Sequence, residues 1–188
     1  MELHPHIRGN FLYPIMIKVP STPLTIFLFP EDHVIGKDAF LGLIANPHET
    51  YIFAYNFSLP ELLQEIKKAD DAGIAIHCLI DHVQFNGPSE KEAVTKLGLS
   101  LKHGEIIVTT AGVNSDAKGQ IWHYKTIVTL NPEGPQCWEG SVNFSSSGFS
   151  QGNSAMLFTS QEYADAVVAE FKVHKEWALA THPEYQIK

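Results

Sequence analysis

The stretch Ile121-Trp-His-Tyr-Lys-Thr-Ile-Val128, followed closely by Glu139-Gly-Ser-Val-Asn143, decides how this chain is interpreted. Both segments are rich in strand formers, and Asn131-Pro-Glu-Gly134 between them is typical of a turn. The sequence therefore predicts a β-hairpin. Alternate side chains of a strand share one face, so His123 and Lys125 are expected to point in the same direction.

The same parity predicts that Glu139, Ser141 and Asn143 share a face, so the hairpin brings together an imidazole, an ammonium, a hydroxyl and an amide. A neutral imidazole can attack phosphorus, and the other three groups can donate to the charged oxygens of the transition state. Alone, a His-x-Lys strand or a Gly-Ser-x-Asn turn is common in proteins without catalysis. Their order across one hairpin favours phosphoryl chemistry at His123 and Lys125.

The rest of the chain predicts an α/β fold with a parallel core, because strand and helix patterns alternate. Ser58-Leu-Pro-Glu61 has capping-box spacing and predicts the start of a helix that Gly73 closes. From Glu105 to Phe158, strand patterns dominate and add strands to the same sheet. The other expected strands are 24–29, 51–55 and 74–80, and the other expected helices are 36–45, one opening at Ser89, and 161–178.

These motifs resemble the phospholipase D superfamily, whose pattern is His-x-Lys, then an Asp, then Gly-Ser-x-Asn. The chain is most similar to small bacterial endonucleases with one motif copy per chain, and the likeness runs from about residue 26 to about residue 180. The resemblance implies an α/β/α sandwich with a mixed, partly parallel central sheet. It also implies that His123 is the nucleophile, that Lys125 and Asn143 bind phosphate, and that Ser141 is the motif serine.

Two positions depart from the family pattern. The family's Asp falls on Leu130, with Asn131 next to it. The glutamate that orients the histidine in family members falls on Ala155. A histidine nucleophile needs an acceptor on its far nitrogen to hold the tautomer. Glu139 is one candidate for that acceptor, and the alternative is that Glu139 is a solvated strand residue.

Composition describes an ordinary globular chain of 188 residues, 44% hydrophobic and 18% charged. We expect a proline-rich N-terminal arm over residues 1–23 and one domain over residues 24–188. Cys78 and Cys137 have no metal spacing and are interpreted as buried free thiols. No signal peptide or membrane span is visible, which favours a cytoplasmic protein, with a processed secreted form as the alternative.

The net charge of −8 argues against a protein that coats nucleic acid, so contact with nucleic acid is expected only in a cleft. Asp81-His-Val-Gln-Phe-Asn-Gly87 follows the carboxyl end of a strand, and is either part of the substrate rim or a plain loop. We expect no metal and no other cofactor, since no ligand motif is present.

The predicted function is that of a metal-independent endonuclease that acts through a phosphohistidine at a homodimer interface, because the mechanism needs a second histidine as acid. The alternatives are a lipid hydrolase with the same chemistry and a weakened or non-catalytic nucleic-acid-binding protein, which Ala155 favours.

Overall fold

One mixed sheet organises the chain. The computed structural model describes residues 17–18, 23–45, 48–110 and 121–187, and their strands follow the order β1-β2-β8-β7-β6-β3-β4-β5-β9. The bounds are β1 Ile17–Lys18, β2 Leu24–Phe29, β3 Thr50–Ala54, β4 Ile76–Asp81, β5 Glu105–Thr109, β6 Lys125–Thr129, β7 Gln136–Gly140, β8 Asn153–Thr159 and β9 Gln186–Ile187. Strand β4 is parallel to β3 and β5, and the other pairs are antiparallel. The prediction of a mixed, partly parallel sheet is confirmed.

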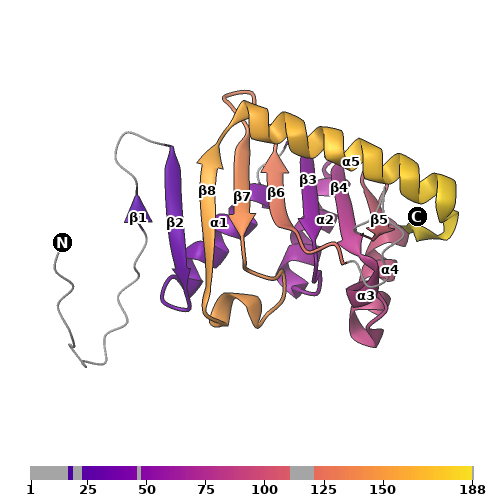
Figure 1. Cartoon of the computed structure of the whole chain (residues 1–188), viewed down its shortest axis with the longest axis horizontal. Coiled ribbons are helices and arrows are strands. Elements are labelled where there is room, and N and C mark those ends of the chain that lie inside the picture. The colour runs from indigo at the N-terminus through magenta and orange to yellow at the C-terminus, as the bar shows by residue number, and fades with distance from the viewer. Residues whose placement is uncertain (1–16, 19–22, 46–47, 111–120, 188) are drawn as a thin grey trace.

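Helices cover both faces of this sheet (Figure 1). The long helix α5 crosses the face nearest the viewer, and α1 and α2 lie behind the sheet. The bounds are α1 His33–Ala45, α2 Pro60–Asp71, α3 His82–Phe85, α4 Pro88–Ser100 and α5 Gln161–Thr181, with short 3-10 helices at Gly148–Ser150 and Pro183–Tyr185. The layers therefore form the expected α/β/α sandwich.

The central strands are apolar because both of their faces are buried. Every residue of β3, β5 and β6 is buried. One core cluster contains Ile52, Ile127 and residues of α1 and α2, and a second packs the opposite face against α5. The two free cysteines are buried, as predicted, one in each cluster.

Most predicted elements occur with shifted ends. Helix α1 begins at His33 rather than at residue 36, and α5 extends to Thr181. Of the predicted arm over residues 1–23, the structure describes residues 17–18 and 23, and Ile17–Lys18 pairs with β2. The remainder of the arm lies outside the described residues.

The predicted capping box at the start of α2 is wrong. The Ser58 hydroxyl donates to the Asn56 side chain at 2.7 Å, and Leu59 is the N-cap residue without a side-chain cap bond. Glu61 instead pairs with Lys37. The chain is held here from outside the helix, because the N–H groups of Ser58 and Leu59 both donate to the Phe144 carbonyl. A distant segment thus does what the local motif was expected to do.

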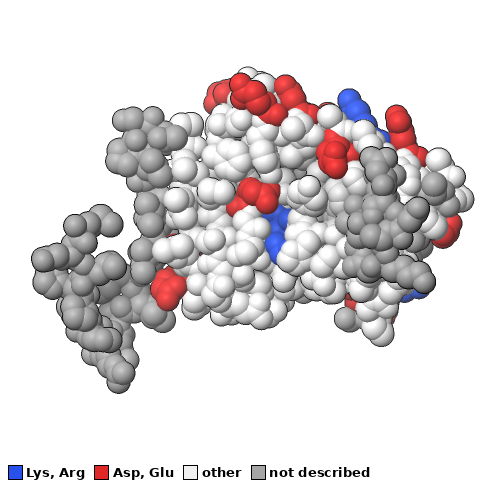
Figure 2. Space-filling view, in the orientation of Figure 1, with Lys and Arg blue, Asp and Glu red and all other residues white. Residues whose placement is uncertain are grey.

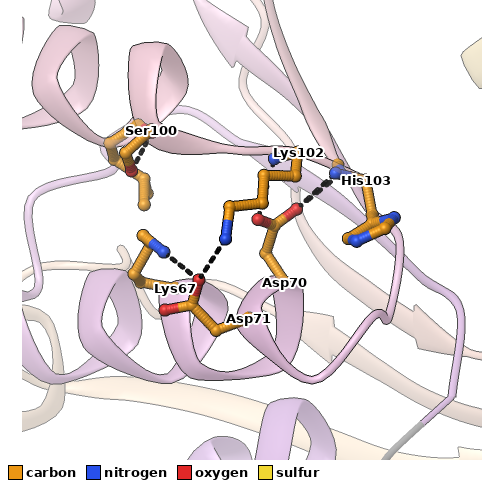
Figure 3. Close-up of polar contacts among 8 residues, drawn as sticks. Lys67, Asp70, Asp71, Ser100, Lys102 and His103 are labelled. Carbon is orange, nitrogen blue, oxygen red and sulfur yellow. Dashed lines mark hydrogen bonds and ion pairs between the residues drawn. The ribbon is translucent and has the colours of Figure 1, made fainter.

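A buried carboxylate ties the end of α2 to the loop before β5 (Figure 3). Asp70 accepts hydrogen bonds from the N–H groups of Lys102, His103 and Gly104 at 2.7–2.8 Å. Burial by itself would raise the pKa of Asp70, but the three donors outweigh it and hold the pKa below its ordinary value. Neighbouring Asp71, by contrast, is half exposed and pairs with Lys67 and Lys102.

We expect Asp70→Asn to lower the free energy of unfolding at pH 7 by about 1–3 kcal/mol, because buried donors lose a charged acceptor. A depressed folded pKa contributes stability above the unfolded value and loses it as pH falls through the folded value. The difference from wild type should therefore shrink in acid. Urea unfolding at pH 7 and pH 3 measures it, with Asp71→Asn as the exposed control. Equal loss in both variants would contradict the assignment.

Candidate active site

The predicted site residues gather at one edge of the sheet. Strands β3, β4 and β7 end at this edge and β6 and β8 begin there, at the bottom of Figure 1. The β6–β7 hairpin is confirmed by its antiparallel pairing and by the turn bond from the Gly134 N–H to the Asn131 carbonyl. The hairpin therefore brings both halves of the motif to the same edge.

His123 lies just before β6, not within a strand running from residue 121 as predicted. Strand β6 begins only at Lys125, and the His123 side chain is exposed at the edge. The backbone is fixed beside it, because the Trp122 N–H donates to Asp81 Oδ2 at 2.7 Å. Asp81 is fully buried, and its other oxygen caps α3. This carboxylate thus positions the segment that carries His123 from a different strand.

The pKa of His123 is lowered, first by burial and then by the nearby Lys125 charge, while Asp81 opposes the shift. A lowered pKa leaves the imidazole neutral near pH 7. Neutral imidazole is the nucleophilic form, so the electrostatics of this edge suit the role predicted for His123.

Lys125 is a buried cation without a carboxylate partner among the described residues. Lys125 is only 4% exposed, and its Nζ donates a hydrogen bond to the His123 carbonyl at 2.8 Å. Nζ also lies 5.1 Å from the centre of the Tyr55 ring. Burial lowers the pKa of Lys125, while the charges of Glu139 and Asp81 oppose that shift. Such an ammonium retains donors for an anion.

The second half of the motif follows the end of β7. Ser141 Oγ donates to Asn153 Oδ1 at 3.1 Å and accepts from the Ser154 N–H at 3.0 Å. Gly140 is required here, because a Cβ at this position would lie 2.3 Å from the Ser154 carbonyl oxygen. Asn143 is half-buried, and its Oδ1 is buried without a hydrogen-bond partner among the described residues.

The structure brings His123 and Lys125 into direct contact and places Ser141 and Asn143 at the same edge. Extending the register of β6 and β7 by two residues sets Lys125 opposite Gly140. No hydrogen bond within the described residues joins Ser141 or Asn143 to Lys125.

The proposed role of Glu139 as orienting group is not supported. Its carboxylate accepts hydrogen bonds from the hydroxyls of Thr126 and Tyr163, the latter on α5. Thr126 and Lys125 alternate on β6, so Glu139 lies on the opposite sheet face from Lys125. Strand β7 ends at Gly140, so strand parity does not extend to Ser141. Glu139 therefore helps to dock α5.

Sequence reasoning named residues 81–87 as a substrate rim or a plain loop, and residues 82–85 of this segment form helix α3. It did not single out Tyr55 or Glu90, which also support this edge. Asp81 and Tyr55 stand at or just after the carboxyl ends of β4 and β3, which was the one available signal. Glu90 of α4 is buried and accepts from the Phe57 N–H at 3.1 Å. Burial raises the pKa of Glu90 to about 7, and Asp81 adds to the shift.

No group of three His, Cys, Asp or Glu side chains is arranged to hold a metal ion in the part of the chain that the structure describes. The polar groups gathered at this edge are instead the imidazole of His123, the ammonium of Lys125, and the side chains of Ser141 and Asn143.

Comparison with solved structures identifies the architecture. NucT from Helicobacter pylori superposes with a TM-score of 0.69 at 15% sequence identity, over 81% of this chain and 95% of NucT. Nuc from Salmonella typhimurium, a phospholipase D family member, superposes with a TM-score of 0.66 at 17% identity, over 82% of this chain and 94% of Nuc. This chain has the phospholipase D fold.

The phospholipase D fold also matches part of a larger enzyme. Polyphosphate kinase from Porphyromonas gingivalis superposes with a TM-score of 0.57 at 12% identity, over 81% of this chain and 26% of the kinase. No protein-family profile and no curated protein matches the sequence itself. At these identities the likeness is one of fold, so the chemistry rests on the residues of the site.

The two departures from the phospholipase D pattern lie in different places. Leu130 follows β6 at the end opposite His123, about 17 Å along the strand direction from Lys125. Its change therefore does not touch the site. Ala155 on β8 is 1% exposed and pairs with Gly140 of β7, directly beside the predicted site. Ala155 is thus the departure that bears on chemistry.

Proposed function

We propose that the chain is a metal-independent phosphodiesterase that cleaves nucleic acid, most specifically an endonuclease, with His123 as nucleophile. The observation that carries the proposal is the buried ammonium of Lys125, which has no ion pair among the described residues. This ammonium contacts the backbone of His123, whose side chain is exposed and whose lowered pKa favours the neutral form. A buried cation costs free energy unless an anion compensates it. A phosphate oxygen is the anion that this chemistry supplies.

In the first step, the neutral imidazole of His123 attacks phosphorus and forms a P–N bond. The P–O bond to one nucleoside breaks, and the leaving oxygen takes a proton from a general acid. Lys125, Ser141 and Asn143 donate to the non-bridging oxygens as charge develops on them. The His-x-Lys motif supplies one histidine per chain, so in this proposal the acid is His123 of the partner subunit.

In the second step, water attacks the phosphohistidine, and its proton passes to the imidazole that served as acid. The P–N bond breaks and a phosphomonoester leaves. Two symmetry-related imidazoles close together titrate as a pair, so the pair holds one proton while each member separately favours the neutral form. A two-fold dimer therefore supplies both roles with one residue type.

The surface proposed for this dimer is the sheet face beside α5. Helix α5 crosses the upper part of this face in Figure 1. On the same face, Tyr124 is 45% exposed and Met156 is 38% exposed. A cavity of about 290 Å³ lies between Tyr124, Thr126 and α5. Exposed apolar side chains on this face favour contact with a second chain.

The charge distribution favours a substrate that enters a cleft. Acidic side chains gather along the α5 edge of the molecule in Figure 2, and the net charge is −8. Nucleic acid would therefore bind weakly and with few neutralised phosphates, so binding should fall as salt rises. No described helix is long and apolar enough to cross a bilayer.

The experiment that tests this function incubates the protein with end-labelled single- and double-stranded DNA and RNA, and with phosphatidylcholine vesicles, in excess EDTA. We expect cleavage of nucleic acid with 5′- or 3′-phosphate ends, and a dimer by light scattering. Activity that disappears in EDTA and returns with Mg²⁺ or Zn²⁺ would refute the mechanism. Release of lipid head groups in preference to nucleotides would favour the lipid hydrolase.

A second candidate is a nucleic-acid-binding protein with little or no catalysis, and Ala155 favours it. In that position a glutamate would orient the histidine by the family pattern. The Ala155 side chain lies on the side of Gly140 where a side chain of residue 140 would stand, since a Cβ built on Gly140 would lie 3.0 Å from the Ala155 Cβ. A longer side chain at residue 155 would therefore extend toward Lys125 across a glycine.

We expect Ala155→Glu to raise turnover by about tenfold or more, on the scale of an orienting carboxylate beside a histidine. Single-turnover cleavage of labelled nucleic acid in EDTA measures the change. Ala155→Gln is the matched control, because it has the same length without the charge and should give less. If both variants and the wild type bind nucleic acid but cleave nothing, the binding protein is the better description.

A further inference from the structure

Tyr55 contacts both key residues of the proposed site and comes from a different strand. It follows the carboxyl end of β3, and its ring centre lies 4.5 Å from that of His123. The ammonium of Lys125 lies 5.1 Å from the same ring. The Tyr55 N–H also donates to the Tyr124 carbonyl at 2.8 Å, between the two motif residues. One residue thus holds the backbone and both side chains of the His-x-Lys motif.

The Tyr55 ring is itself held in place. Its hydroxyl accepts a hydrogen bond from Gln84 Nε2 at 2.8 Å, and Gln84 belongs to α3. Helix α3 is anchored by Asp81, whose Oδ1 accepts from the Val83 and Gln84 N–H groups. The same Asp81 accepts from the Trp122 N–H beside His123. The buried carboxylate of Asp81 therefore helps to hold both the Tyr55 ring and the backbone beside His123.

This arrangement gives a physical role to a residue that the motif does not contain. Ala155 offers no acceptor to the His123 imidazole, and Glu139 is bound to Thr126 and Tyr163. The Tyr55 ring, by contrast, packs directly against the imidazole. A ring held on one face restricts the rotamers of the histidine, although it does not select a tautomer.

We propose that Tyr55, tethered by Gln84, is the positioning residue that orients His123 for attack on phosphorus in place of the absent carboxylate. This inference rests on the proposed function, since it takes His123 as the nucleophile. It also explains the low exposure of Lys125, whose ammonium is covered by the same ring. Tyr55 does not touch the reacting phosphorus, so its effect is on geometry and on the environment of the imidazole.

The test combines a rate with a titration. The probe is bis(p-nitrophenyl) phosphate, and the titration follows the His123 imidazole by NMR, assigned with His123→Asn. For Tyr55→Leu we expect kcat to fall by about 10²-fold, with KM changed by less than about threefold, since misplacement acts on the chemical step. The imidazole becomes better solvated, so its pKa should rise toward the ordinary value.

Tyr55→Phe keeps the ring and should restore most of the lost rate and the lowered pKa. The matched control is Tyr51→Leu, because Tyr51 lies near the start of β3, the strand that Tyr55 follows, and packs its ring 4.8 Å from that of His77. That variant should change the His77 resonance and leave His123 unaffected. Wild-type rate and titration in Tyr55→Leu would overturn the proposal.

Two further outcomes keep the test decisive. If Tyr55→Leu does not fold, Gln84→Ala releases the tether and should lower kcat by about threefold to tenfold. An unchanged rate and titration there would overturn the proposal equally. If the wild type does not turn over the probe, the titration decides the positioning role by itself, and the proposed function fails separately.

Discussion

Turnover should fall by at least about 10⁴-fold in His123→Ala, because the covalent route requires the imidazole and only binding and polarisation of the phosphate would remain. The side chain is exposed at the sheet edge, so the fold should be unaffected. The measurement is cleavage of labelled nucleic acid in EDTA, with unfolding in urea followed in parallel. His33→Ala, which removes an exposed histidine at the start of α1, is the matched control.

The pH profile provides an independent check on the same residue. Burial and the Lys125 charge lower the pKa of His123, so the neutral nucleophile persists to lower pH than an ordinary histidine allows. We therefore expect the acid limb of kcat/KM to lie below about pH 6.5. An acid limb well above this value, or residual activity in His123→Ala equal to that of His33→Ala, would be incompatible with the assignment.

Lys125→Met should lower activity and at the same time raise the stability of the fold. Turnover should fall by about 10²–10³-fold, because a donor to the developing phosphate charge is lost. The free energy of unfolding should rise, because the buried ammonium has no carboxylate partner among the described residues and methionine has a similar length. If Lys125 had only a structural role, its replacement would not lower turnover while raising the free energy of unfolding.

The control for this variant is Lys37→Met. Lys37 pairs with Glu61 at 2.7 Å between α1 and α2, away from the site. It should leave turnover unchanged and give no gain in stability. Turnover by Lys125→Met at the wild-type rate would remove the observation on which the proposed function depends.

Local patterns were sufficient for the hairpin, the mixed sheet and the edge that carries the motif. The turn at residues 131–134 joins neighbouring strands, so the pairing of β6 with β7 follows from short-range sequence alone. Apolar runs buried on both faces likewise identify the central strands from composition. The candidates His123 and Lys125 also came from the order of the residues.

Patterns failed where a residue is held by a part of the chain far away in sequence. The capping box at Ser58 was displaced by bonds to Phe144. Parity misled for Glu139, because the strand ends at Gly140 and the rule of alternate faces holds only within a strand. The first error arose from a partner distant in sequence, and the second arose because the end of the strand could not be located from the sequence.

The sequence was sufficient to name the motif residues and the class of fold, because their signals lie within short segments and follow strand and helix periodicity. It could not show that Asp81 holds Trp122 or that the Tyr55 ring lies on His123. Those contacts join residues about 40 and 70 positions apart, and they exist because β3, β4 and β6 are neighbours in the sheet. Strand order is set by packing of the whole domain, so only the tertiary structure could show which residues lie against His123 and its neighbours.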